Sequence, residues 1–215
     1  MKNQIKRAIP KQIRRSALFL MLSLTASICL SASNEVVDNK YCTTCHGSDG
    51  RGNEAIQAPI LAGMEDWYLV RQLENYRGNI RGFHPSDERG IAMQAMAKNL
   101  SDEDIIDLVQ WIKTWEYSPP DTTVTGDKTE GEKLYASCAA CHGENADGNE
   151  TLGAPPLAYQ NDWYLVTQLK NFLNGYRGTH ESDTFGQQMV AMARPLKDDS
   201  GIRNVVAYIT SLRSK

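Results

Sequence analysis

The sequence lacks three features that would indicate common classes of protein. It has no excess of basic residues, since 23 Lys and Arg face 26 Asp and Glu, whereas binding to nucleic-acid phosphates needs clustered, surplus positive charge. It has no convincing alternation of apolar and polar residues, the pattern of a half-buried strand. Apart from residues 16–30, it has no apolar run long enough to cross a membrane. These absences argue against a nucleic-acid binder and a β-sheet protein.

The first 33 residues differ from the rest of the chain in charge. They contain six basic residues and no acidic ones: Lys2, Lys6, Arg7, Lys11, Arg14 and Arg15. A basic segment followed by an apolar run and small residues is typical of a secretory signal peptide. We expect residues 1–33 to be this signal peptide and the protein to be periplasmic, with an uncleaved N-terminal membrane tether as the alternative. Without the leader, 17 basic residues face 26 acidic ones, so the exported part is acidic.

Four of the five cysteines form two identical patterns outside the leader. Each pattern is Cys-x-x-Cys-His, and the residues are Cys42, Cys45, His46, Cys138, Cys141 and His142. This is the attachment signature of c-type haem, because two thiols one helical turn apart can form thioethers to one porphyrin while the adjacent histidine binds the iron. One zinc ion shared by the two pairs, or disulfides, are the alternatives. The 96-residue separation argues against zinc.

The two motifs belong to a longer tandem repeat with the same offset of 96 residues. The segment DWYLV at 66–70, for example, recurs at 162–166. A Pro-Pro pair and a polar stretch predict a linker over residues 118–127. We therefore expect one domain over residues 34–117 and a second over residues 128–215.

Each repeat has the apolar spacing of helices. In the first repeat Trp67, Val70 and Leu73 recur at helical spacing, and Ser101 with the acids after it predicts the start of a final helix. A unit of about 90 residues with this pattern is a small helical bundle, and it needs the haem as its largest apolar component. The predicted fold class is all-α.

The sixth ligand of each iron has three candidates at matching positions of the two repeats: His84 and His180, Met93 and Met189, Met96 and Met192. A Met-x-x-Met pattern precedes the final helix in both repeats, which favours methionine over histidine. Methionine as core filler is the competing interpretation. The residues alone do not choose between the two methionines.

The order of these motifs resembles a class I c-type cytochrome, and two such units in tandem resemble the dihaem cytochrome c4 type. The resemblance implies two cytochrome c domains, each wrapped around a covalently attached haem c. It implies that the ligand is the methionine eight residues before Ser101, which is Met93, with Met189 as its counterpart. The second repeat departs from the pattern because Lys197 stands where the first has Ser101.

The resemblance also implies roles for residues around the haem. It places the carbonyl groups of Pro59 and Pro155 against the imidazole N–H of the proximal histidines, a bond that sets their orientation and basicity. Candidate partners of the haem propionates are Arg71, Arg81 and Arg177, with Trp67 and Trp163. Ordinary surface charge and core packing are equally good interpretations of any one of these residues. We expect His84 and His180 to be loop residues near the haem edge.

A histidine and a methionine fill both axial positions of an iron, which leaves it no open site for a substrate. We therefore expect an electron carrier and not an enzyme. The expected partners are a redox protein donor and acceptor, such as a membrane cytochrome complex and a terminal oxidase or reductase. The alternatives are a dihaem enzyme, such as a peroxidase or a sulfur- or nitrogen-compound oxidoreductase, and a fixed cytochrome subunit of an oxidase or dehydrogenase.

Overall fold

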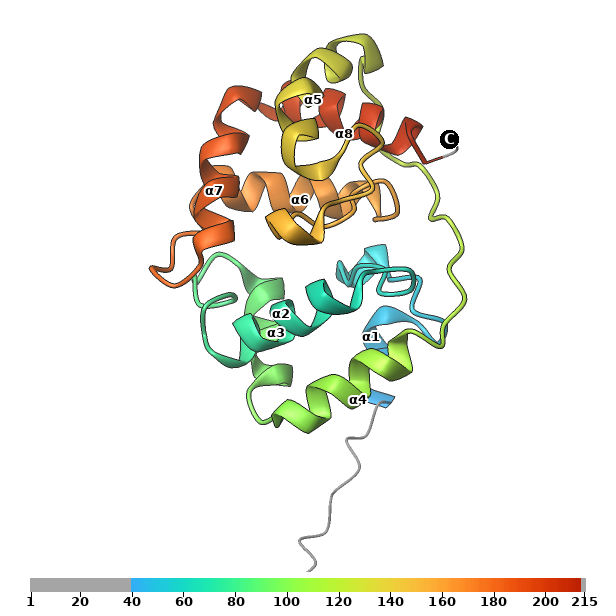
Figure 1. Ribbon diagram of the computed structural model, residues 1–215, viewed down its shortest axis with the longest axis vertical. Helices are drawn as coiled ribbons and strands as arrows, with labels where there is room; N and C mark the ends of the chain where they lie inside the picture. Colours follow the sequence, from blue (N-terminus) through green and yellow to red (C-terminus); the bar gives the residue numbers. More distant parts are fainter. Residues whose placement is uncertain (1–39, 214–215) are drawn as a thin grey trace, which may run out of the picture. The chain divides into compact units, whose positions relative to one another are not determined.

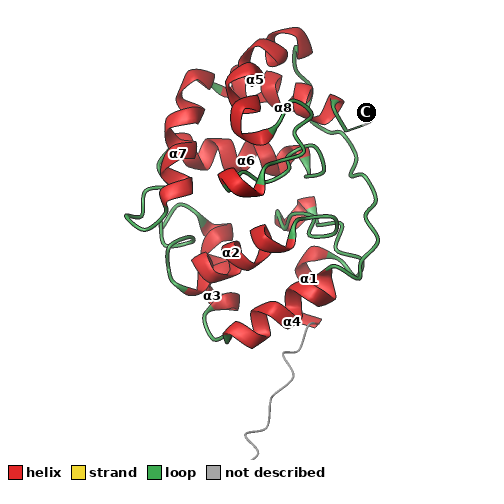
Figure 2. Cartoon of the chain, viewed as in Figure 1, coloured by secondary structure: helices red, strands yellow, loops and turns green. Residues whose placement is uncertain are grey.

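The computed structural model describes residues 40–213, and the regular structure of these residues is helical (Figure 2). The all-α prediction is therefore confirmed. Outside the helices, the described residues form two isolated bridges, Asn53 with Ala58 and Asn149 with Ala154. The predicted signal peptide, residues 1–33, lies outside the described residues. Within residues 40–213 we find no helix with the length and apolar character needed to cross a membrane.

The helices follow the repeat along the chain (Figure 1). The first repeat contains α1 (Lys40–His46), the 3-10 turn η1 (Glu54–Ile56), α2 (Asp66–Arg77), α3 (Glu88–Ala97) and α4 (Asp102–Ile112). The second contains α5 (Lys128–His142), η2 (Glu150–Leu152), α6 (Asp162–Leu173), α7 (Thr184–Ala193), η3 (Arg194–Leu196) and α8 (Asp199–Ser211). All the described residues belong to one compact unit.

The last helix of each repeat is capped in a different way. In α4 the Ser101 hydroxyl accepts from the backbone N–H of Asp104 at 3.1 Å, while the Asp104 carboxylate accepts from the N–H of Ser101 at 2.7 Å, a capping box. In the second repeat, Lys197 has a positive φ of 62° and does not cap α8. Asp198 is the cap of α8 instead, and its carboxylate accepts from Gly201 N–H at 2.9 Å. The second cap is therefore shifted by one residue and is not lost.

Apolar stripes of the helices form a core in each repeat. The core of the first repeat contains Met64, Leu69, Val109 and Ile112. The core of the second is larger, and its members include Tyr135, Leu165, Val166, Ile202, Val205, Val206 and Ile209. Helix α4 packs on α2, and α8 packs on both α5 and α6. The two haem motifs lie at the ends of α1 and α5, and α8 packs directly on α5.

The segment between α4 and α5 is extended and contacts the second repeat. The buried carboxylate of Asp162 accepts hydrogen bonds from the backbone N–H groups of Thr123 at 2.5 Å and Val124 at 2.7 Å. Earlier in the same segment, the carbonyl of Pro120 accepts a hydrogen bond from Arg213 at 2.5 Å. These bonds attach the segment to α6 and to the end of the chain.

Candidate haem sites

The first Cys-x-x-Cys-His motif forms the end of α1. One turn of helix separates Cys42, which is half-buried, from Cys45, which is exposed, and the two thiols are free. His46 is only 4% exposed, and its Nδ1 lies 2.7 Å from the carbonyl oxygen of Pro59. A carbonyl can only accept, so Nδ1 carries the proton and Nε2 holds the lone pair.

The Nε2 atom of His46 is the best indicator of a metal ligand in this repeat. It is buried and has no hydrogen-bond partner among the residues that the structure describes. Burial lowers the pKa of His46, although the bond to the Pro59 carbonyl acts in the opposite direction. The lowered pKa favours the neutral imidazole, the form that binds a metal. Burial also raises the pKa of the Cys42 thiol.

The second motif forms the end of α5 and has the same local geometry. His142 is buried, and its Nδ1 lies 2.8 Å from the carbonyl oxygen of Pro155. Burial lowers the pKa of His142 and raises that of the Cys138 thiol. Cys138 is half-buried and Cys141 is exposed. The structure thus brings Pro59 and Pro155 to the two histidines, as the resemblance implies.

A tight glycine turn returns the chain from each motif to its proline. Gly52 has φ +85° and Gly148 has φ +83°, a left-handed conformation that favours glycine. Their N–H groups donate to the carbonyls of His46 and His142, both at 2.8 Å. A Cβ at Gly52 would lie 2.7 Å from Ile60 N, so no side chain fits. The turn sets the position of the proline carbonyl.

The candidate sixth ligands lie on the third helix of each repeat. Met93 on α3 and Met189 on α7 are half-buried. Met96 and Met192, one turn later, are 49% and 38% exposed. The less exposed pair is the pair that the resemblance implies. That Met93 and Met189 bind iron stays a prediction.

These residues fit a covalently bound haem in each repeat. Two thiols one turn apart, a buried histidine whose Nδ1 is bonded to a proline carbonyl, and a half-buried methionine on another helix are the donor set of a c-type haem with histidine and methionine ligands. In the described part of the chain, no group of three or more His, Cys, Asp or Glu side chains is placed to hold a metal ion. Those residues therefore offer no ligand set for the zinc alternative.

The three arginines predicted near the haem propionates have different surroundings. Arg71 donates to the carbonyl of Gly153 at 2.6 Å and lies over the rings of Trp67 and Phe185. Arg71 thereby connects the two repeats. Arg81 and Arg177 connect them as well, through reciprocal hydrogen bonds, and each has a buried Nε without a partner among the described residues. Their hydrogen bonds run from Arg81 to Gln72, Tyr164 and Gln168, and from Arg177 to Gln168, Tyr68 and Gln72.

His84 and His180 lie in the loops before α3 and α7. The Nδ1 atoms accept from the backbone N–H groups two residues later, both at 3.1 Å. His84 stacks on Tyr176 with ring centroids 4.7 Å apart, and His180 packs edge-on against Phe83. Each histidine therefore contacts an aromatic ring of the other repeat, a role that the sequence did not indicate.

Sequence reasoning also missed a polar contact behind the first haem motif. Asn161 Oδ1 accepts from the backbone N–H of Ile60 at 2.7 Å, and Gln160 Nε2 donates to the carbonyl of Ile60 at 3.3 Å. At the matching positions the first repeat has Glu65 and Met64. The sequence signal for this contact is that these two positions differ between repeats that otherwise match closely.

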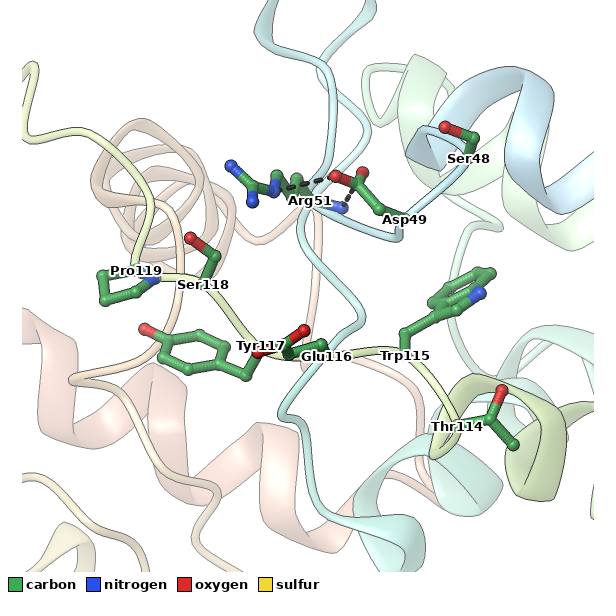
Figure 3. Close-up of a pocket in the computed structure, with 9 residues that line it drawn as sticks. All are labelled: Ser48, Asp49, Arg51, Thr114, Trp115, Glu116, Tyr117, Ser118 and Pro119. Carbon is green, nitrogen blue, oxygen red and sulfur yellow. Dashed lines mark hydrogen bonds and ion pairs between the residues drawn. The ribbon is translucent and has the colours of Figure 1, made fainter.

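A hollow of about 450 Å³ lies beside the first haem motif (Figure 3). It is lined by Ser48, Asp49, Arg51, Thr114, Trp115, Glu116, Tyr117, Ser118 and Pro119. Arg51 Nε lies 2.8 Å from Asp49 Oδ2, and Figure 3 shows these two side chains directed at each other. The second repeat has Asn145 and Asp147 at these positions, so the ion pair belongs to the first repeat alone. The two charges neutralise each other, and we assign no ligand to the hollow.

Comparison with known proteins identifies the family to which both repeats belong. The family model described as cytochrome c matches twice, over residues 31–116 and 129–213. The chain is 31% identical to cytochrome c4 of Stutzerimonas stutzeri, over 91% of this chain and 97% of that protein. It is 34% identical to the thiosulfate dehydrogenase electron acceptor of Stutzerimonas stutzeri strain A1501, over 81% of this chain and 80% of that protein.

A solved structure agrees with these sequence matches. The crystal structure of reduced recombinant cytochrome c4 from Pseudomonas stutzeri superposes with a TM-score of 0.62 and 30% identity, covering 80% of this chain and 93% of that one. The chain therefore belongs to the cytochrome c family, as a protein with two tandem cytochrome c domains and two covalently bound haem c groups.

Proposed function

We propose that this electron-transfer protein holds its first haem through Cys42, Cys45 and His46, and its second through Cys138, Cys141 and His142, with Met93 and Met189 as the sixth ligands. The observation that carries the assignment is the buried Nε2 of His46, which has no partner within residues 40–213 and lies on the same helix as two free thiols. The same motif geometry in the second repeat supports the same assignment there.

Haem c supplies one-electron chemistry, with iron cycling between Fe(II) and Fe(III). The protein's own residues attach, orient and shield it. The paired thiols would form the thioether bonds, and the Pro59 and Pro155 carbonyls hold the histidine rings in the tautomer that leaves Nε2 available. Thioether ligation by methionine stabilises the ferrous state and raises the potential relative to two histidines.

The two repeats present matching histidine and methionine residues, which favours a carrier over an enzyme. A dihaem peroxidase or similar enzyme needs one iron with a vacant or labile position, and neither repeat lacks a candidate for any ligand. We also propose domains over residues 34–117 and 128–215 with a linker over residues 118–127. The two family matches, over 31–116 and 129–213, support these bounds.

We propose that the protein works in the periplasm after export by residues 1–33. Its partners are a redox donor and a redox acceptor, such as a membrane cytochrome complex and a terminal oxidase or reductase. One relative is named thiosulfate dehydrogenase electron acceptor. That name favours a second candidate donor for this chain, an enzyme that oxidises an inorganic sulfur compound.

Single methionine variants of the purified holoprotein test the ligand assignment. In Met93→Ala and in Met189→Ala, we expect the Met–Fe(III) charge-transfer band to fall by about half, because one haem of two loses its ligand. Met96→Ala and Met192→Ala are the matched controls and should keep the full band. Rapid cyanide binding or peroxide turnover by the unsubstituted protein would contradict the carrier function.

A further inference from the structure

One peptide group links the proximal histidine of the first repeat to a side chain of the second. The carbonyl of Pro59 accepts from His46 Nδ1 at 2.7 Å, and the N–H of the same peptide group, on Ile60, donates to Asn161 Oδ1 at 2.7 Å. The result is a continuous chain of hydrogen bonds from the imidazole, through one amide, to Asn161.

The position of Asn161 is well defined. It is the N-cap residue of α6, yet its side chain makes no capping bond to that helix. Instead the side chain is buried against Ile60, which is fully buried. The backbone N–H of Asn161 donates to Gln160 Oε1 at 2.8 Å, and Gln160 in turn donates to the Ile60 carbonyl. Because a backbone N–H can only donate, the Asn161 oxygen and not its NH2 group must face Ile60.

The second repeat cannot form the equivalent chain. The residue that follows Pro155 is Pro156, which has no N–H. The position equivalent to Asn161 is Glu65, whose side chain is exposed. Both histidines therefore donate to a proline carbonyl, but only the peptide group behind His46 has a partner on its far side.

Hydrogen bonds in a chain polarise one another, and the effect is stronger in a dry interior. The bond from Ile60 to Asn161 makes the Pro59 oxygen a better acceptor. A better acceptor draws the Nδ1 proton of His46 and leaves the ring richer in electrons. Partners of this kind tune the basicity of a metal-binding histidine, and a more electron-rich ligand stabilises the higher oxidation state of a metal.

We propose that Asn161 is a positioning residue of the second repeat that acts through the Pro59–Ile60 peptide group and His46, and lowers the reduction potential of the first-repeat haem alone. The proposal rests on the proposed role of His46 as an iron ligand. It makes the two haems inequivalent although their motifs are the same.

The test is a pair of substitutions in the full-length holoprotein with ¹⁵N-labelled histidine. Asn161→Leu removes the acceptor. We expect one of the two midpoint potentials to rise. In NMR spectra of the reduced protein, the resonance of the His46 Nδ1 proton should shift upfield, while that of the His142 Nδ1 proton should not shift. Asn161→Asp keeps an oxygen at this position and should move the His46 proton downfield, so a poorly folded leucine variant does not end the test. Glu65→Leu is the matched control and should change neither histidine.

Equal shifts of both potentials, or an unmoved His46 proton in both Asn161 variants, would overturn the proposal. The unsubstituted protein separates this result from a failure of the ligand assignment. If His46 binds iron, its Nδ1 proton shows a large paramagnetic shift on oxidation. Without that shift the ligand assignment itself fails, and this inference fails with it.

Discussion

The two repeats share a segment, DWYLV, whose first residue plays opposite roles in them. Asp66 is at the surface and pairs with Lys113 at 2.8 Å. Asp162 is fully buried and accepts from the backbone of Thr123 and Val124 and from the N–H of Trp163 at 2.7 Å. The difference arises because the segment that joins the repeats packs on the second of them. Equal sequence produced equal helices, and the surroundings decided what each aspartate does.

The largest expected effect follows directly from this contrast. Asp162→Ala leaves several backbone N–H groups without their acceptor, and we expect a loss of about 3 kcal/mol of unfolding free energy. Asp66→Ala removes one exposed ion pair and should cost no more than about 0.5 kcal/mol. Denaturant unfolding of the two holoproteins, followed by circular dichroism, measures both. Equal losses would mean that the joining segment contributes nothing to stability.

A second comparison concerns the turn that both repeats need equally. Alanine at Gly52 or at Gly148 would place a Cβ in a left-handed conformation and within 3 Å of backbone atoms. We expect each substitution to cost about 2 kcal/mol and to weaken the contact between the histidine and the proline carbonyl. Thermal unfolding and haem content of the two variants provide the measurement. If alanine destabilised the protein at only one of the two glycines, the two motifs would be less alike than their hydrogen bonds indicate.

Arg81 and Arg177 test how symmetric the contact between the repeats is. The two make reciprocal bonds, but Arg81 is buried while Arg177 is half-buried. We expect Arg81→Ala to cost about 2 kcal/mol and Arg177→Ala about 1 kcal/mol, because removing the more buried donor leaves more polar atoms unpaired. Since the two share Gln72 and Gln168, the double variant should not be additive. Unfolding of the two single variants and the double variant measures this coupling, and strict additivity would argue against a shared network.

Local spacing predicted the helical fold of both repeats. The motif and the helices depend on residues close in sequence, and the resemblance to c-type cytochromes implied the link from His46 to Pro59. What depends on packing between the repeats could not be read in this way. Asn161 and Asp162 look like a helix start in any repeat, and only burial against Ile60 and the joining segment gives them their roles.

The shifted cap of the second repeat shows the same limit on a smaller scale. Lys197 replaces Ser101, but one extra residue lets Asp198 take over as the cap. At an offset of 96 residues Lys197 aligns with Ser101, whereas the backbone of α8 needs only an acceptor near its first N–H groups. The cap of α8 therefore lies one residue later than the 96-residue offset of the repeat predicts.

The smallest expected effects compare these two caps. We expect Ser101→Ala and Asp198→Ala each to cost about 1 kcal/mol. They should differ in pH dependence, because the Ser101 hydroxyl, followed by its backbone N–H, lowers the pKa of Asp104. A carboxyl whose pKa is lower in the folded state stabilises the fold above its ordinary pKa, and this stability is lost as pH falls through the folded value. In Ser101→Ala, the unfolding free energy should therefore fall less steeply as the pH is lowered. We call this fall at low pH the acid limb. Asp198→Ala leaves the Ser101–Asp104 pair in place and should keep the part of the acid limb that this pair contributes. An acid limb unchanged by Ser101→Ala would mean that the capping box does not form in solution.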